Sequence, residues 1–154
     1  DAIVINASGC GTPIKDYGFM FREDAAWAEP AARVSALARD ISEFMVELGL
    51  STVTPPEPMT LAYHSACSLQ HGQKIAAAPK RLLESCGFTV RDVPERHLCC
   101  GSAGTYNILQ PLLARQLRDR KIANIESTRP DAVAISARKT SRAASSAATV
   151  PRSS

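Results

Sequence analysis

Apolar residues are arranged along this chain in two different patterns. Short runs rich in β-branched residues end at Gly, Pro or polar positions, as buried strands typically do, and they predict strands at residues 2–6, 59–64, 88–93 and 131–135. Between these runs, apolar residues recur every three or four positions, as in amphipathic helices, and this spacing predicts helices at residues 25–48, 69–86 and 106–126. A loop is expected at residues 10–13 and a turn at residues 98–104, where Gly and Cys occur together.

The order of these elements predicts the fold class. Strands that alternate with helices favour an α/β fold, in which a mainly parallel sheet is built from βαβ units and is flanked by helices. Within the second predicted helix, Pro79 is expected to kink or restart the helix, and Gly87 is expected to end it.

Two breaks in composition divide the chain into three parts. Pro55, Pro56 and Pro58 form a stiff connector. From residue 137 the sequence consists mainly of Ala, Ser, Arg and Thr without periodicity, so a disordered tail is expected. The predicted parts are residues 1–56, 57–136 and 137–154. Because Asp1 leads straight into an apolar run with no initiator Met, we expect the first part to be truncated.

Charge and hydropathy argue against two functional classes, nucleic-acid-binding proteins and membrane-spanning proteins. Four of the 18 Lys and Arg residues, and none of the 15 Asp and Glu residues, lie in the tail, so the net charge of +3 belongs to the tail. A nearly neutral body without a basic stripe argues against nucleic-acid binding. No apolar run approaches the roughly 20 residues that a membrane-spanning helix needs.

The five cysteines, at positions 10, 67, 86, 99 and 100, carry the candidate chemistry. An odd number of cysteines without secretory features favours free thiols or metal ligation over disulfides, and hence a cytoplasmic setting. Cys10, Cys67 and the pair Cys99–Cys100 each follow a predicted strand. Because parallel strands end at one edge of a sheet, we expect these thiols to converge there. Converging thiolates favour zinc or an iron–sulfur cluster.

The adjacent pair Cys99–Cys100 favours a cluster over zinc. Neighbouring side chains in an extended segment point to opposite sides, so two irons of a cluster accept them more easily than one small ion does. Plain packing of buried thiols remains the alternative for the pair and for Cys10, and it is the preferred interpretation of Cys86. His64 is interpreted either as a hydrogen-bond donor to a thiolate or as a structural residue. The glycines near Cys100 do not form a nucleotide-binding loop, because the GxGxxG order is absent.

Several stretches of the sequence resemble one known family. LAYHSACSLQHGQKI, CCGSAGTYNILQPLLARQLRDRKIANI and PDAVAIS are similar to the second cysteine-rich repeat of glycolate oxidase iron–sulfur subunits, a family related to the cysteine-rich subunits of heterodisulfide reductases. The opening DAIVINASGCGTPIKDYG resembles the end of the preceding repeat. The resemblance covers about residues 1–135, and residues 99–125 are its most specific part.

The resemblance implies a ligand set and a function. It implies metal ligation by Cys67, Cys99 and Cys100 within one repeat and by Cys10 as the last cysteine of the other, with a 4Fe-4S cluster as the expected cofactor. It further implies a complex in which flavin-bearing subunits with FAD oxidise glycolate to glyoxylate. This chain would then pass electrons toward quinone without being catalytic alone. The expected location is cytoplasmic, with peripheral association at the inner face of the cytoplasmic membrane through the complex.

The sequence departs from the family pattern at two places. The final Gly-x-x-Cys of the family is replaced by Ala-Arg-Lys-Thr-Ser after Ser136, and Ser65 stands where the family has Asp. These departures leave other hypotheses open: a metal-free interaction or assembly domain of the same complex, an iron–sulfur subunit of a lactate or glycerol 3-phosphate dehydrogenase, and a thiol-redox or zinc module.

Overall fold

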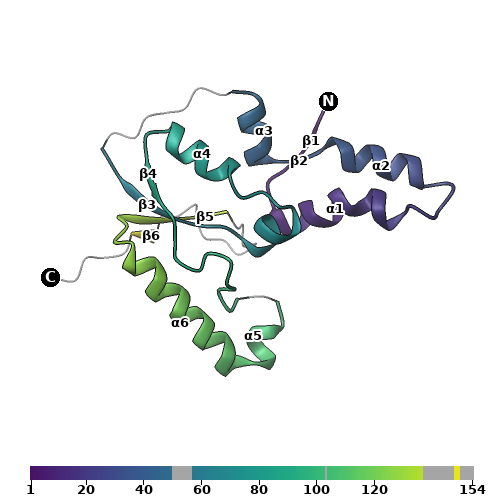
Figure 1. Cartoon of the computed structure of the whole chain (residues 1–154). Helices are drawn as coiled ribbons and strands as arrows, with labels where there is room; N and C mark the ends of the chain where they lie inside the picture. Colours follow the sequence, from purple (N-terminus) through teal and green to yellow (C-terminus); the bar gives the residue numbers. More distant parts are fainter. Residues whose placement is uncertain (50–56, 103, 137–147, 150–154) are drawn as a thin grey trace.

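The computed structural model describes residues 1–49, 57–102, 104–136 and 148–149 (Figure 1). Helices and strands alternate along most of this part of the chain. In order they are β1 (Ile3–Ile5), α1 (Ser8–Met20), α2 (Ala28–Leu37), β2 (Ala38–Asp40), α3 (Ile41–Glu47), β3 (Thr60–His64), the π-helical turn η1 (Ser68–Gly72), α4 (Ala78–Ser85), β4 (Thr89–Arg91), α5 (Tyr106–Leu109), α6 (Pro111–Ser127), β5 (Ala132–Ile135) and β6 (Ala148–Thr149).

The larger sheet has the strand order β4-β3-β5-β6. Strand β3 pairs in parallel with both β4 and β5, and Leu61 lies opposite Val90 on one side and Ala132 on the other. Leu61, Ala62 and Ala132 are buried, so this strand core anchors the domain. Helix α4 lies above and α6 below these strands in the view of Figure 1. The α/β class with parallel pairing is therefore confirmed.

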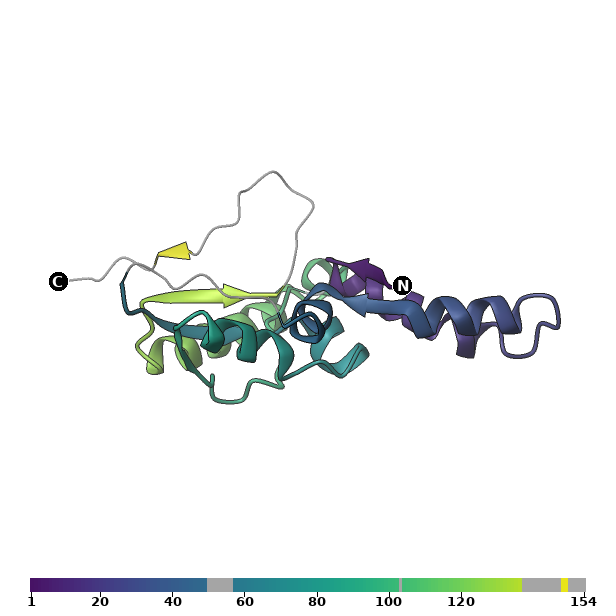
Figure 2. The ribbon, with the colours of Figure 1, turned by 90° about the horizontal axis from the view of Figure 1, so that it is seen from above.

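A second, two-stranded sheet is formed by β1 and β2, which pair in parallel with Ile3 opposite Ala38. Between these strands, α1 and α2 pack side by side and project from the rest of the molecule (Figure 2). The predicted strands thus form two sheets and not one continuous sheet. The prediction that the first strand is buried is wrong at Ile3 and Val4, which are 37% and 42% exposed, and correct at Ile5.

The single helix predicted at residues 25–48 is wrong. Its centre is extended, because β2 pairs with β1 and Asp40 then caps the new helix α3. The Asp40 carboxylate accepts hydrogen bonds from the Ser42 amide at 2.9 Å and the Ser42 hydroxyl at 2.6 Å, while the Glu43 carboxylate accepts from the Asp40 amide at 3.0 Å. This reciprocal capping box satisfies amide groups at the start of a helix.

Proline positions explain two further breaks. The helix predicted at residues 69–86 divides into η1 and α4, with Pro79 in the first turn of α4 and Gly87, at φ 89°, just after its end. The helix predicted at residues 106–126 divides into α5 and α6, because Pro111 begins a new helix. Proline is favoured at a first helical position, where its missing amide costs nothing.

Two sequence predictions fall partly outside the described residues. Pro55 and Pro56 lie outside them, as does most of the tail, residues 137–147 and 150–154. Residues 148–149 form β6, which pairs antiparallel with β5. Within the described chain, no helix has the length and apolar content needed to cross a membrane.

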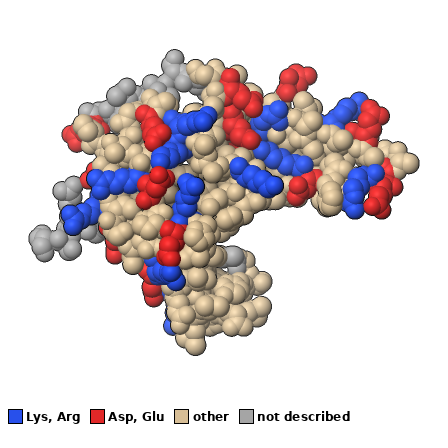
Figure 3. Space-filling view, viewed as in Figure 1, with Lys and Arg blue, Asp and Glu red and all other residues tan. Residues whose placement is uncertain are grey.

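Charged residues are mixed on the face seen in Figure 3, where basic and acidic side chains alternate over most of the surface. The lower lobe, formed by α5 and the start of α6, carries few of either. Its exposed side chains include Ile108, Leu109 and Leu112.

Candidate metal centre

Cys67 lies three residues beyond the end of β3, at the start of η1. Two neighbours hold this segment in place. The Ala66 amide donates a hydrogen bond to the Ser136 hydroxyl at 2.9 Å, and Leu69 is buried at 1% exposure. Cys67 itself is exposed. The parallel pairing of β3 with β5 brings Ser136 beside Ala66, so the sheet positions this cysteine.

Cys99 and Cys100 lie in a loop that rests directly on α6. Gly101 has φ 76°, and a Cβ atom at this position would lie 2.2 Å from the carbonyl oxygen of Ala114. Only glycine permits that conformation together with such a close approach. The Gly101 amide donates to Cys99 Sγ at 3.3 Å, and the Ser102 hydroxyl lies 3.1 Å from Cys100 Sγ. The loop therefore places a polar group beside each of the two sulfur atoms.

The structure brings Cys67, Cys99 and Cys100 together, and we call these residues the cysteine triad. Although Cys67 is exposed as a residue, partial desolvation of its thiol raises the pKa, and so do the charges of Cys99 and Cys100 and a hydrogen bond to the Cys99 side chain. For Cys100, burial also raises the pKa, but hydrogen bonds from Ser102 and from the Cys100 backbone, together with the Lys121 charge, make the net direction downward. Mutual repulsion of this kind requires thiols that lie close together.

Lys121 is a residue of this site that the sequence did not reveal. It is 4% exposed, and its ammonium donates hydrogen bonds to the carbonyl oxygens of Glu95 at 3.0 Å and Arg96 at 3.4 Å. Burial lowers the pKa of Lys121, while the cysteine triad opposes that shift. Burial and the Lys121 charge together lower the pKa of His64. In the sequence Lys121 follows Arg118, Asp119 and Arg120, and nothing distinguishes it from a surface residue.

Cys10 lies in α1, and the loop predicted at residues 10–13 is wrong. Its helix is held beside the triad segment, because the Ser8 and Ser68 hydroxyls are 2.7 Å apart and the Gln73 amide donates to the Ser8 carbonyl at 2.9 Å. Cys10 itself is exposed. Cys86, at the end of α4, is half-buried and so is not a fully buried core residue.

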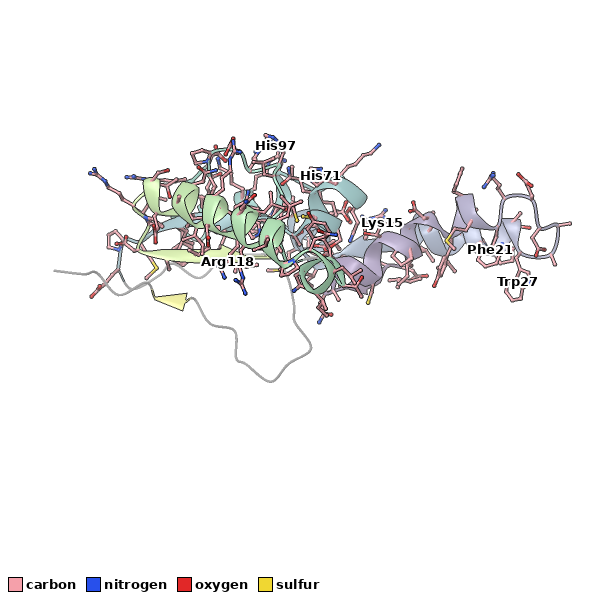
Figure 4. The ribbon with its side chains drawn as sticks, turned by 90° about the horizontal axis from the view of Figure 1, so that it is seen from below. Lys15, Phe21, Trp27, His71, His97 and Arg118 are labelled. Carbon is pink, nitrogen blue, oxygen red and sulfur yellow. The ribbon has the colours of Figure 1, made fainter. Side chains whose placement is uncertain are left out.

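The other two histidines, His71 and His97, connect two segments of the site. His71 Nε2 lies 3.2 Å from the His97 carbonyl oxygen, and Figure 4 shows the two residues side by side. This contact joins η1 to the loop that precedes Cys99. Both residues thus help to fix the relative position of the two triad segments.

Ser65 lines a cavity distinct from the triad. The cavity has a volume of about 20 Å³, and Tyr63, Lys80, Asp92 and Arg96 also line it. None of the triad cysteines contributes to the lining formed by the described residues. The Ser65 hydroxyl is buried and has no hydrogen-bond partner among the described residues.

The donor set fits an iron–sulfur cluster better than a single ion. In the described part of the chain, no group of three or more His, Cys, Asp or Glu side chains is arranged to hold a metal ion. A cluster is several ångströms across and takes thiolates at separate irons, so its ligands need not converge on one point. The triad supplies three thiols, and the Gly101 amide supplies a hydrogen bond to sulfur of the kind that tunes such sites.

The fold and the site together define a parallel α/β module that gathers cysteine thiols beyond the end of its central strand. A family model described as a cysteine-rich domain, CCG, matches residues 61–139, about half of the chain. The chain belongs to this CCG cysteine-rich domain family.

Similar curated proteins extend the likeness to most of the chain. The glycolate oxidase iron-sulfur subunit of Escherichia coli is 46% identical over 133 residues, which are 86% of this chain and 33% of that protein. The probable glycolate oxidase iron-sulfur subunit of Bacillus subtilis is 30% identical over 83% of this chain and 30% of its own length. Lactate utilization protein A of Geobacillus thermodenitrificans is 31% identical over 85% of this chain and 56% of its own length. The chain thus spans between 30% and 56% of the length of these relatives.

Proposed function

We propose that this chain is part of an iron–sulfur electron-transfer subunit and that Cys67, Cys99 and Cys100 are cluster ligands. The observation that carries the proposal is the meeting of these thiols from two segments that are more than 30 residues apart in the sequence. We also propose Cys10 as a ligand contributed by the first part, residues 1–56, because the Ser8–Ser68 contact holds its helix beside η1. We further propose that the chain is divided into residues 1–56, the end of one cysteine-rich repeat, residues 57–136, the second repeat, and residues 137–154, a tail.

A bound cluster would supply one-electron transfer, and the protein would supply position and environment. Cys67 is held by the end of β3, and the Cys99–Cys100 loop is held by α6. The Gly101 amide and the Ser102 hydroxyl are placed to donate to sulfur. Since hydrogen bonds to sulfur and local charge set the potential of such a site, these residues would tune it.

The substrate and partners proposed here rest on the relatives. Glycolate is favoured because the relative with 46% identity is named a glycolate oxidase iron-sulfur subunit. In this proposal, flavin-bearing partner subunits with FAD oxidise glycolate to glyoxylate, and electrons leave through a 4Fe-4S cluster toward quinone. This chain is not catalytic alone. The complex is cytoplasmic and attaches peripherally to the membrane.

Anaerobic reconstitution with iron and sulfide tests the ligand assignment. We expect the unaltered chain to become brown and to bleach on reduction. Cys67→Ser, Cys99→Ser and Cys100→Ser should each lose most of the bound iron and sulfide, because each removes a thiolate ligand. Cys86→Ser is the matched control and should bind iron as the unaltered chain does.

Two results would contradict the proposal. One is a colourless unaltered chain with all of its thiols still titratable after reconstitution, and the other is equal iron binding in all four variants. Bound zinc without iron would favour a zinc module. The metal-free assembly domain is the second candidate, and the sequence Ala-Arg-Lys-Thr-Ser after Ser136, where the family has its final Gly-x-x-Cys, favours it. That candidate predicts unchanged complex assembly and electron flow in the Cys99→Ser variant.

A further inference from the structure

Helix α6 turns a narrow buried stripe toward the cysteine triad. Ala114 and Lys121 are its buried residues among those described. They are seven residues apart, which is about two helical turns, so they lie on the same side of the helix. The backbone of Ala114 is in close contact with Gly101 in the cysteine loop. Lys121 interacts electrostatically with all three triad thiols. A cation therefore occupies a stripe where an apolar residue is the usual choice.

The ammonium of Lys121 is fixed in place by the loop at Glu95 and Arg96. Its described hydrogen bonds go to two backbone carbonyl oxygens, at 3.0 and 3.4 Å, and an ammonium has three N–H groups to donate. Neutral carbonyls orient the cation without cancelling its charge. The Glu95 carboxylate accepts hydrogen bonds from Arg120 Nε and Asn124 Nδ2 at 2.8 Å each, and it is the one other anion that interacts with the Lys121 charge among the described residues.

From this geometry we propose that Lys121 is a positioning residue whose fixed positive charge compensates the negative charge of the cysteine triad and raises the reduction potential of the cluster held there. The part of the inference that concerns a potential rests on the proposed function, whereas the charge facing the thiols does not. Each electron added to a cluster adds negative charge at the site. A fixed cation nearby therefore stabilises the reduced form relative to the oxidised form.

The first experiment needs no iron. In the metal-free chain, each cysteine is alkylated with anionic iodoacetate and with neutral iodoacetamide, and mass spectrometry gives the ratio of the two rates. Both reagents attack the same thiolate, so the fraction of thiol that is ionised cancels in the ratio. The ratio therefore reports the local electrostatic potential, which attracts or repels the anionic reagent. We expect Lys121→Gln to lower this ratio at Cys100 about threefold, the effect of an interaction energy on the order of RT.

The variants separate charge from packing. Lys121→Arg keeps the charge and should keep the ratio. Arg118→Gln is the matched control, because Arg118 lies on the same helix with its side chain 56% exposed and paired with Asp119 (Figure 4). It removes the same charge, and the ratio should not change. If Lys121→Gln does not fold, the unaltered chain still tests the inference. Its ratio of iodoacetate to iodoacetamide rates should be higher at the triad cysteines than at Cys86.

The second experiment measures the midpoint potential of the reconstituted chain by spectroelectrochemistry. In the fraction of Lys121→Gln that binds the cluster, we expect the potential to shift downward by a tenfold change in the one-electron equilibrium, about 59 mV. An unchanged potential, or a triad ratio no higher than that of Cys86, overturns the inference. If the unaltered chain binds no iron, the proposed function fails, and the alkylation ratio alone decides whether Lys121 acts on the thiols.

Discussion

Replacing Gly101 by Ala tests how the cysteine loop is seated on α6. The new methyl group would lie 2.2 Å from the carbonyl oxygen of Ala114, where contacts under 3.0 Å are essentially never found, and 3.0 Å from the carbonyl carbon. Both atoms belong to the backbone of a helix, so neither can rotate away. The loop must move off the helix, and Cys99 and Cys100 must move with it.

Two effects add in this variant. An L-residue at φ 76° costs roughly 1–2 kcal/mol, and overpacking against a fixed backbone costs roughly 1–3 kcal/mol more. The expected loss is therefore about 2–5 kcal/mol of unfolding free energy, or ~6–15 °C in melting temperature for a chain of this size. Gly104→Ala is the matched control. Gly104 has φ 47° with nothing within 4 Å of the added Cβ, so it carries the backbone strain alone.

Urea denaturation followed by circular dichroism measures both variants. We expect Gly101→Ala to unfold at a clearly lower urea concentration than Gly104→Ala, and to bind less iron on reconstitution because the triad is spread. Equal midpoints for the two variants would show that the loop does not rest on α6. The assigned contact between Gly101 and Ala114 would then be wrong.

Two further predictions concern carboxylates. Hydrogen bonds from Arg120 and Asn124 lower the pKa of Glu95 from 4.5 to about 2, so its contribution to stability is present above pH 4.5 and is lost as the pH falls toward 2. The melting temperature should therefore fall less between pH 5 and pH 2 in Glu95→Gln than in the unaltered chain, and equal slopes would refute this. Asp40→Ala should cost about 1 kcal/mol in urea denaturation by removing the cap of α3, and Asp40→Asn should cost less.

The sequence predicted the strands of the domain better than its helices. Each predicted strand lies within a few residues of an observed one, because short β-branched runs bounded by Gly and Pro have few alternatives. Two helix starts carry a local signal in the sequence. The Asp40–Glu43 spacing is a capping-box signal, and Pro111 marks a helix start. That two sheets form could not be predicted, because pairing partners are set by tertiary contacts.

The candidate site was partly predictable for the same reason. The meeting of Cys67 with Cys99 and Cys100 follows from strand ends that gather at one edge, although the pair rests on α6 and does not directly follow β4. The helical state of Cys10 was missed because Gly9, Gly11 and Pro13 disfavour a helix. Tertiary contact overrides that preference, since a Cβ atom at Gly11 would lie 2.4 Å from the Gln73 amide nitrogen. Gly11 thus serves close packing and does not mark a turn, whereas a Cβ atom at Gly9 would have nothing within 4 Å.

The seven-residue separation of Ala114 and Lys121 also limits how this segment can change in length. Inserting or deleting one residue between them would rotate everything beyond it by about 100° around the helix axis. The Lys121 side chain would then face solvent, while Ala114 would stay in contact with Gly101. Substitutions on the outer side of α6 are tolerated by this arrangement, but changes in spacing between the two positions are not.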